Sequence, residues 1–494
     1  MSSHNAANSP REAENLQPGW RYRAHMVRAA PPAPPFRSRL AAGAAFTLAV
    51  ATLALLAAFT IGNLLYVLAA LVSGALAISM VWVAATDHRV RWWAAAAAVI
   101  FVAGAIASLV AAGADALAIV IVVVGILLSS GLADLALRWE VHRVVAHRWR
   151  AVPPTNNGVL FVNPKSGDGK ATRLGLVGEA DRLGIRTVTL EKGDDLRALA
   201  EQAVQDGADA LGMAGGDGSQ AVVASVAAAH GLPFICIPTG TRNHLALDLG
   251  LDRDHPLLAL GAFGAARESS IDLAEVNGQV FVNNVSLGVY ARIVASDEYR
   301  EAKGRTVAEL LPTMLGPGAP RFGLMVDGPD GPVEGACVIE VSNNLYRLTS
   351  IAGFGSRPRL VGGNLGVTTL SVRNAADVNR LVASELAGHP ERFEGWRQWT
   401  STDLVVDGLP ETAAAVDGEA RTWATPLHFR TRPGALRARI AVDEPGASPA
   451  LLHPPVSMNT LFALVRIVVG RPSGIEWEEG RAASAVTQCR GETS

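Results

Sequence analysis

Residues 208–251 read ADALGMAGGDGSQAVVASVAAAHGLPFICIPTGTRNHLALDLGL, and this stretch decides the fold. Its pattern predicts a short apolar strand over 211–214, a glycine-rich turn, a helix, a second strand over 234–237 and another glycine turn. Glycine allows positive φ and leaves backbone N–H groups uncovered, as an anion-binding loop requires. The helix would point its positive N-terminal end at the same loop. Two such loops at the ends of neighbouring strands indicate one shared phosphate ligand.

Two better-known phosphate motifs fail at specific positions. Gly216, Gly218 and Ala221 have the spacing of a dinucleotide fingerprint, but no carboxylate lies about 20 residues further on. Gly169-Lys170 resembles the end of a P-loop, but alanine follows the lysine and proline occupies the position of the first glycine. Neither motif describes this chain.

Four motifs do occur in a fixed order. They are Asn163-Pro164-Lys165-Ser166-Gly167, Gly215-Gly216-Asp217-Gly218-Ser219, Pro238-x-Gly240-Thr241-x-Asn243 and, far downstream, Asp417-Gly418-Glu419. In this order they resemble the catalytic domain of the diacylglycerol kinase and sphingosine kinase family of lipid kinases, over about residues 157–442. The resemblance implies a nucleotide-binding lobe, a β-rich lobe and, between them, a cleft in which ATP phosphorylates a lipid hydroxyl.

The resemblance also implies roles for single residues. Glu419 would be the general base that accepts the proton of the lipid hydroxyl. Asp217 would be catalytic by reaching Mg²⁺, because a carboxylate repels phosphate; capping of the following helix is its alternative role, and we favour the metal. Thr241 and Asn243 would bind the nucleotide or cap their helix. The cradle for the phosphates of ATP would consist of Asn163, Pro164, Lys165, Ser166, Gly167, Gly215, Gly216, Gly218 and Ser219. All of these except Pro164, which has no N–H, could donate a backbone amide, and Lys165 or Arg242 would neutralise phosphate charge.

The chain departs from the family pattern at three positions. Ser219 replaces a threonine and keeps the hydroxyl group. His244 stands where an aspartate commonly follows the asparagine, which removes a carboxylate near the nucleotide. Gly362 occupies a loop position at which some bacterial members hold a structural Mg²⁺ through an aspartate, so we expect this second metal site to be absent.

Apolar runs near 40–60, 61–83, 93–112 and 116–137 predict four transmembrane helices within residues 40–137, because each approaches the ~20 residues that cross ~30 Å of hydrocarbon. An alanine-rich bundle in a soluble domain is the alternative. Arginines follow the second and fourth runs, at Arg89 and Arg91 and again from Arg138 onward. The positive-inside rule therefore predicts an integral protein of the inner cell membrane, with its N-terminus and catalytic domain on the cytoplasmic side.

The rest of the chain divides by composition. We expect a disordered basic tail at 1–39, a juxtamembrane linker at 138–156, an α/β nucleotide-binding lobe at 157–267, an all-β lipid-substrate lobe at 268–446 and a C-terminal extension at 447–494. A helical insertion is predicted at 290–315. Residues 137–152 would form either a helix on the inner leaflet or a solvated linker. A short apolar helical face at 461–468 would pack on the β lobe or touch lipid.

Net charge and cysteine content exclude other classes. A net charge of −2 provides no general attraction to nucleic acid, and the three cysteines have neither metal nor disulfide spacing. Cys236 is predicted to be a small core residue. The sequence thus indicates a membrane-anchored, ATP- and Mg²⁺-dependent kinase for diacylglycerol or a related lipid, with no single lipid or oligomeric state singled out. A non-catalytic nucleotide or lipid sensor on a kinase scaffold and, less favoured, an NAD kinase, which shares the GGDG loop, are the alternatives.

Overall fold

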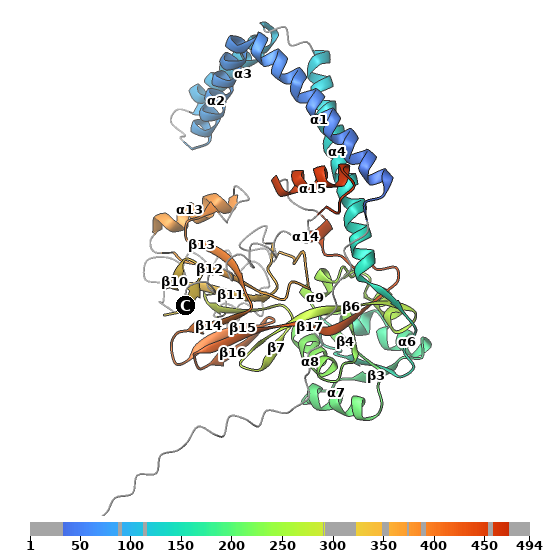
Figure 1. The fold of residues 1–494 in the computed structure, drawn as a ribbon. Coiled ribbons are helices and arrows are strands. Elements are labelled where there is room, and N and C mark those ends of the chain that lie inside the picture. Colours follow the sequence, from blue (N-terminus) through green and yellow to red (C-terminus); the bar gives the residue numbers. More distant parts are fainter. Residues whose placement is uncertain are drawn as a thin grey trace, which may run out of the picture.

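The computed structural model describes residues 33–86, 91–111, 116–289, 291, 323–347, 355–372, 375–386, 392–452 and 458–473. Long helices stand on a body of helices and strands (Figure 1). The predicted fold class is confirmed: an apolar helical region precedes an α/β part with a largely parallel sheet and a part with an antiparallel sheet. Most of the predicted tail at 1–39, nearly all of the helical insertion at 290–315 and the last part of the C-terminal extension lie outside the described residues.

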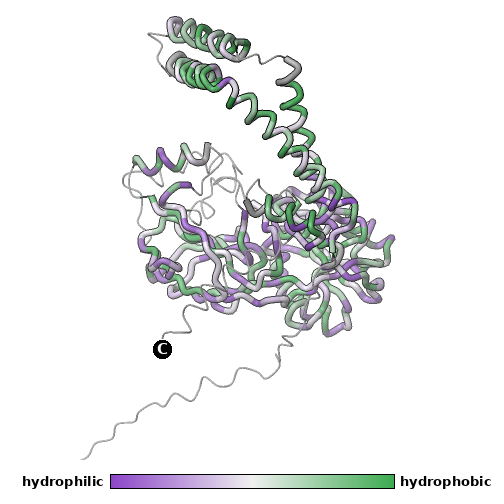
Figure 2. The backbone as a smooth tube through the Cα atoms, turned by 45° about the horizontal axis from the view of Figure 1, so that its top comes forward, coloured by the Kyte–Doolittle hydropathy of each residue, from purple (hydrophilic) through white to green (hydrophobic). Residues whose placement is uncertain are grey.

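Four helices form the apolar region: α1 (Phe36–Gly62), α2 (Leu64–Thr86), α3 (Arg91–Ala111) and α4 (Ala116–Arg148). α1 packs along α4, and α2 packs along α3 beyond the far end of that pair (Figure 1). Their residues are predominantly apolar (Figure 2) and many of their large apolar side chains are exposed, as a helix surrounded by lipid requires. By length and composition three stretches can cross a membrane, Phe36–Gly62, Leu64–Val81 and Val120–Val145, while the apolar stretch Trp92–Ser108 is shorter.

The structure differs from the expectation for residues 138–156. The last apolar helix does not end near 137 but continues as α4 to Arg148, so most of this segment is helical rather than an irregular linker. Val141, Val145 and Trp149 enter the hydrophobic core of the body, and the Trp149 Nε1–H donates to the carbonyl of Gly446 at 2.9 Å. The helix region is therefore joined to the body by a packed helical stalk.

The parallel strands are short apolar runs, as strands buried on both faces usually are. They lie in the order β5 (Pro233–Pro238), β4 (Ala210–Gly215), β2 (Gly158–Val162), β3 (Arg186–Thr189). The segment between β2 and β3 forms two short helices that are divided at Gly175, whose φ is +63°. The connecting helices are α5 (Lys170–Arg173), α6 (Leu176–Arg182), α7 (Leu196–Gln205), α8 (Asp217–Ala229), α9 (His244–Asp248) and the 3-10 helix η1 (Pro256–Phe263).

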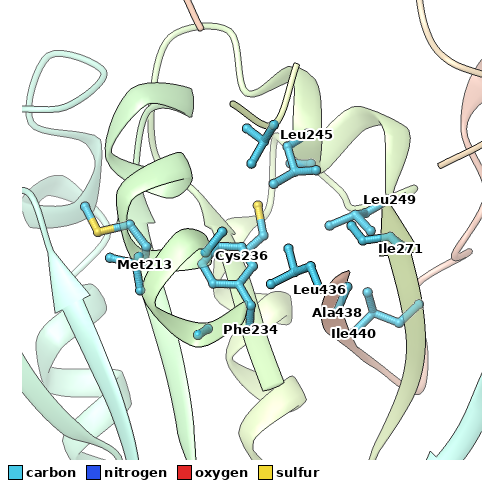
Figure 3. Packing of buried hydrophobic residues seen from close by; sticks show 14 of the residues in the cluster. Met213, Phe234, Cys236, Leu245, Leu249, Ile271, Leu436, Ala438 and Ile440 are labelled. Atoms are coloured by element: carbon cyan, nitrogen blue, oxygen red, sulfur yellow. The ribbon is translucent and has the colours of Figure 1, made fainter. Parts of the chain in front are cut away.

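One strand, β17 (Leu427–Ala441), joins the two halves of the body. It pairs antiparallel with β6 (Ala266–Val276) along most of its length. Its first half also pairs antiparallel with β14 (Asp403–Asp407), and its second half pairs in parallel with β5. Figure 3 shows Phe234 and Cys236 of β5 near Leu436 and Ala438 of β17. Cys236 is thus a core residue as predicted, and burial raises the pKa of its thiol. The same sheet also contains β1 (Arg150–Val152), β7 (Gln279–Phe281), β9 (Met325–Gly328) and β10 (Gly331–Glu334).

The expected division at residue 267 is consequently not a break in the sheet, because β6 crosses it and the end of β17 returns to β5. A second, antiparallel sheet packs on the outer half of the first, and apolar side chains of both sheets, such as Val341, Leu287 and Phe429, form one core. Its order is β13 (Trp396–Ser401), β12 (Leu365–Leu370), β11 (Val338–Asn343), β8 (Asn284–Gly288), β15 (Thr412–Val416), β16 (Glu419–Trp423). The remaining helices are α13 (Ala375–Leu386), α14 (Pro449–Leu452) and α15 (Met458–Val468).

Candidate functional site

The first three motifs follow the C-terminal ends of the adjacent strands β2, β4 and β5, where parallel sheets bind ligands. Their backbones lie in direct contact. A Cβ on Gly167 would overlap the carbonyl oxygen of Thr239, and a Cβ on Gly240 would lie 2.5 Å from the Cα of Gly216. The Oγ of Ser166 lies 3.6 Å from the Cβ position of Gly216. Glycine is required here because any side chain would separate the three turns.

The glycines of the second motif do not adopt the positive φ that the sequence suggested. Gly216 has φ −85° and ψ 173° and is the N-cap of α8, so Asp217, Gly218 and Ser219 already form the first helical turn. The motif is therefore a strand-to-helix junction rather than a wrapped loop. Its glycines are needed for close approach, because a Cβ at Gly215 would overlap the Ser219 Oγ and one at Gly218 would overlap Glu419.

Asp217 caps a helix, but not the one that follows it. Its Oδ2 accepts the N–H of His244 at 3.1 Å and its Oδ1 accepts the N–H of Leu245 at 3.2 Å, and both N–H groups belong to the first turn of α9. The carboxylate is buried and fixes α9 beside α8. This capping leaves further lone pairs on both oxygens, so a metal-binding role for Asp217 stays a prediction.

Glu419 comes to the same junction from the second sheet. β15 and β16 form a hairpin in which Val416 pairs with Glu419 across Asp417 and Gly418, whose φ values are +47° and +83°. Positive φ at both central residues is the type I′ turn that fits the twist of a hairpin. The Glu419 carboxylate lies against Gly218, with Cδ 2.6 Å from the position of a Cβ there. This hairpin is therefore the element that brings Glu419 to α8.

Asp417 holds this hairpin in place. Its Oδ2 accepts the N–H of Val282 at 2.9 Å, and its Oδ1 accepts those of Asn283 at 2.8 Å and Asn284 at 3.2 Å. Burial raises the pKa of the Asp417 carboxyl to about 7, although the three N–H donors act in the opposite direction and the nearby Asp217 adds to the increase. The buried side chain of Asp417 therefore fixes the position of Glu419, which lies two residues further along the chain.

A buried arginine links the two ends of the site. Arg357 is fully buried; its Nε lies 2.6 Å from Oδ2 of Asp248, the last residue of α9, and its backbone N–H donates to Oδ1 at 2.8 Å. Its Nη1 donates to the carbonyls of Val282 at 2.6 Å and Asn343 at 2.8 Å. Asp217, α9, Asp248, Arg357 and the 282–284 segment therefore form a continuous series of contacts that ends at Asp417.

Several residues that were predicted to bind the nucleotide form hydrogen bonds within the protein. The Asn243 side chain accepts from the Gly240 N–H at 3.2 Å and donates to the Gly240 carbonyl at 2.7 Å, so it stabilises its own turn and does not cap α9. Asn163 Oδ1 accepts the backbone N–H of Lys165 at 3.1 Å, and the Ser219 hydroxyl donates to the carbonyl of Gly216. The side chain of Lys165 is exposed, as is Thr241. Nucleotide binding by these residues, and by Pro164, stays a prediction.

His244 and Gly362, the two other positions at which the chain departs from the family pattern, lie in different parts of the structure. Burial lowers the pKa of His244 to about 4, against the attraction of Asp217, so the imidazole beside the site is neutral at physiological pH. Gly362 donates its N–H to Oδ1 of Asn344 at 2.8 Å, and a Cβ there would overlap that oxygen. Asp272 accepts from the Gly363 N–H at 2.6 Å, so hydrogen bonds hold this loop. Among the described residues, no group of three or more His, Cys, Asp or Glu side chains is arranged to hold a metal ion.

The sequence analysis missed Arg357 and Asp248 and assigned no role to Asp417. A buried arginine has no local signature, and its partners Asp248 and Val282 lie 109 and 75 residues away along the chain. Asp417 had one signal, its place in the fourth motif two residues before Glu419.

Part of this chain matches a known protein family. Residues 157–276 match the family of the diacylglycerol kinase catalytic domain. The region that contains the first three motifs is therefore similar to that catalytic domain.

Individual proteins are similar to different parts of this chain. A protein of Pseudomonas aeruginosa named "Probable lipid kinase YegS-like" is 28% identical over 309 residues, which cover 56% of this chain and 90% of the relative. A diacylglycerol kinase of Mycobacterium tuberculosis is 33% identical over 120 residues, 24% of this chain, and the match spans only 39% of the relative's length. A crystal structure described as a diacylglycerol kinase from Bacillus anthracis aligns with a TM-score of 0.46 and 18% identity, over 60% of this chain and 99% of the other.

Proposed function

We propose that this chain transfers the γ-phosphate of ATP to a hydroxyl group of a membrane lipid, diacylglycerol or a close relative. The observation that carries the proposal is the contact between the Glu419 carboxylate and Gly218 at the N-terminus of α8. Phosphoryl transfer requires a hydroxyl acceptor to be activated close to the bound phosphates. In this arrangement a general base lies beside a helix end that favours anions.

The N-terminal turn of α8 supports phosphate binding. The first N–H groups of a helix have no partners within it, and the helix dipole adds partial positive charge. Ser166 lies beside Gly216, so the turn over 163–167 borders the same space. We assign the β- and γ-phosphates of ATP to the amides of these two segments, with the exposed Lys165 as a neighbouring cation.

The residues present fit a magnesium ion of the kind that kinases use. Mg²⁺ in such sites is held by one or two carboxylates together with phosphate oxygens and water, so a complete protein cage is not needed. Asp217 would hold it through the lone pairs that α9 does not occupy, and bound Mg²⁺ would neutralise charge on the phosphates. Glu419 is a second carboxylate near α8.

Glu419 would act as the base. Its side chain is 56% exposed, and Arg421 lies 3.3 Å from its Oε2. As the lipid oxygen bonds to the γ-phosphorus and the bond to ADP breaks, Glu419 would take the hydroxyl proton. General-base catalysis of this kind contributes ~10²–10⁴-fold.

The test uses the full chain in lipid nanodiscs with labelled ATP and a panel of lipids. We expect one lipid class to acquire the label and Glu419→Gln to reduce the rate by ~10²-fold or more. Glu411→Gln is the matched control, because Glu411 is exposed and lies before β15, at the opposite end of that strand from the turn. Asp217→Asn is a poorer test, since it also disturbs the cap of α9.

Two outcomes would contradict the proposal. Full activity of Glu419→Gln would exclude the general base. Binding of ATP without labelling of any lipid would favour the sensor alternative, whereas labelling of NAD would favour the NAD kinase alternative.

We further propose that the body lies on the cytoplasmic side of the inner membrane, where ATP is available. The arginines at the body-proximal ends of α1 and α4, among them Arg37 and Arg138, support this orientation.

A further inference from the structure

The helix α15 is apolar on two opposite faces. One face packs inward: Ala463 and Ile467 are buried, and Leu464 and Val468 are partly buried against the same cluster. The other face is exposed: Leu461 is 41%, Phe462 54%, Val465 40% and Val469, directly after the helix, 59% exposed. At 100° per residue these four positions form one continuous stripe. A stripe of this size on a surface helix indicates an apolar partner.

The inward face fixes α15 across the lower ends of two apolar helices. Ala463 and Ile467 pack with Ala41 and Ala42 of α1 and with Ala136 and Leu137 of α4, rather than with the second sheet. Arg39 donates to the carbonyl of Val468 at 3.4 Å, which places a cation at the C-terminal end of α15. Figure 1 shows α15 lying across the α1–α4 pair, on the side that faces the body.

α15 lies beside the ends of α1 and α4 at which their uncharged segments stop and charged residues begin. From Leu40 to Gly62 α1 has no charged residue, and α4 has none from Ala116 to Ala133. Immediately below, Arg37 lies 5.1 Å from the ring centroid of Trp139, and Asp134 pairs with Arg138 at 2.7 Å. Tryptophan and arginine at the end of an apolar span are typical of the boundary between hydrocarbon and water.

We propose that α15 is an interfacial helix that inserts Leu461, Phe462, Val465 and Val469 into the headgroup–acyl boundary of the leaflet nearer the body. Helices of this kind sink ~5–10 Å into that boundary and lie in its plane. The bilayer is the occupant because the stripe is continuous with the exposed apolar surface of α1 and α4, at the depth where their uncharged segments end.

The consequence is a fixed height of the body above the membrane. The part of α4 from Arg138 to Arg148 extends ~16 Å below the boundary, and its lower end is packed into the core of the body through Val145 and Trp149. α15 and the stalk together would prevent the body from sliding toward or away from the leaflet. This inference concerns the membrane position of the chain and does not depend on its catalytic activity.

The test measures depth with a spin label on the full chain in nanodiscs of phosphatidylcholine and phosphatidylglycerol. In a background without the native cysteines, single cysteines replace Phe462 or Val465 on the exposed face of α15. Leu258→Cys is the control, because Leu258 is an equally exposed apolar residue on η1 of the body. Unchanged thermal unfolding of each variant shows that the fold is kept.

We expect the labels at Phe462 and Val465 to collide with oxygen more often, and with a water-soluble nickel chelate several-fold less often, than the label at Leu258. Equal collision with nickel at all three positions would show that α15 lies in water and would overturn the proposal. Low collision with both oxygen and nickel at Phe462 would also overturn it, because the stripe would then be covered by protein, as in a contact with a second copy of the chain.

Discussion

The contact between Gly218 and Glu419 makes Gly218→Ala a direct test of the site. The added methyl would lie 2.6 Å from Cδ and 3.0 Å from Cγ of Glu419, and it would overlap Oε1. An ordinary contact begins at 3.4 Å, so the carboxyl carbon must retreat by about 0.8 Å. A misplacement of ~1 Å at a catalytic group can lower the rate by ~10²-fold. We therefore expect kcat to fall by about that factor.

Stability should change in the other direction. Gly218 has helical geometry in the first turn of α8, and alanine is favoured over glycine in helices by up to about 1 kcal/mol. The Glu419 side chain is more than half exposed, so it can turn toward solvent without disturbing the core. The variant should unfold at the same temperature as the parent chain or higher, and a loss of activity would not reflect unfolding.

Gly178→Ala is the matched control, because Gly178 lies early in α6 and nothing lies within 4 Å of its Cβ position. It should show a similar change in stability and no change in activity. Steady-state kinetics with lipid and ATP varied separately complete the test. Full kcat in Gly218→Ala would refute the role of Glu419, and an increased KM for ATP with unchanged kcat would mean that the methyl obstructs the nucleotide instead.

Three further predictions concern the surroundings of the site. Arg357→Met should lower the free energy of unfolding by about 3–5 kcal/mol, because it leaves the buried carboxylate of Asp248 uncompensated. The control Arg182→Met breaks an exposed pair with Glu179 and should cost less than about 1 kcal/mol; denaturant unfolding measures both. The pKa of His244 is about 4 in the folded state, below its unfolded value of 6.5. The unfolded chain therefore binds the proton first, and the free energy of unfolding falls as the pH drops from 6.5 to 4. The melting temperature of His244→Gln should decline less over this window. Asn243→Ala removes both hydrogen bonds to Gly240 and should raise the KM for ATP more than it lowers kcat, and an unchanged KM would contradict this.

The sequence predicted what depends on local pattern. The apolar runs at 211–214 and 234–237 lie in strands β4 and β5, and the glycine motifs follow their C-terminal ends. The predicted positive φ of Gly216 was wrong. Glycine is frequent at positive φ, but this glycine is needed because its neighbours leave no room for a side chain. Only the positions of Gly240 and Ser166 in space reveal that reason.

The local sequence pattern could not predict contacts between residues far apart in the chain. The return of β17 to β5 makes one sheet of two predicted units, and no local signal distinguishes a strand that stays in its own sheet from one that crosses to another. The same holds for Asp217: capping of the following helix, α8, was the alternative role, but its carboxylate caps α9, because the chain doubles back through β5 before α9 begins.

These long-range contacts have a mechanical consequence for the two carboxylates. Asp217 is bonded to the start of α9, the end of α9 to Arg357, and Arg357 to the segment that Asp417 clamps beside Glu419. Because β17 also runs through both halves as one strand, a hinge between the halves would have to break a sheet and a buried ion pair together. We therefore expect the distance between Asp217 and Glu419 to be set before ligands bind, so that access of the lipid depends on segments outside this series of contacts.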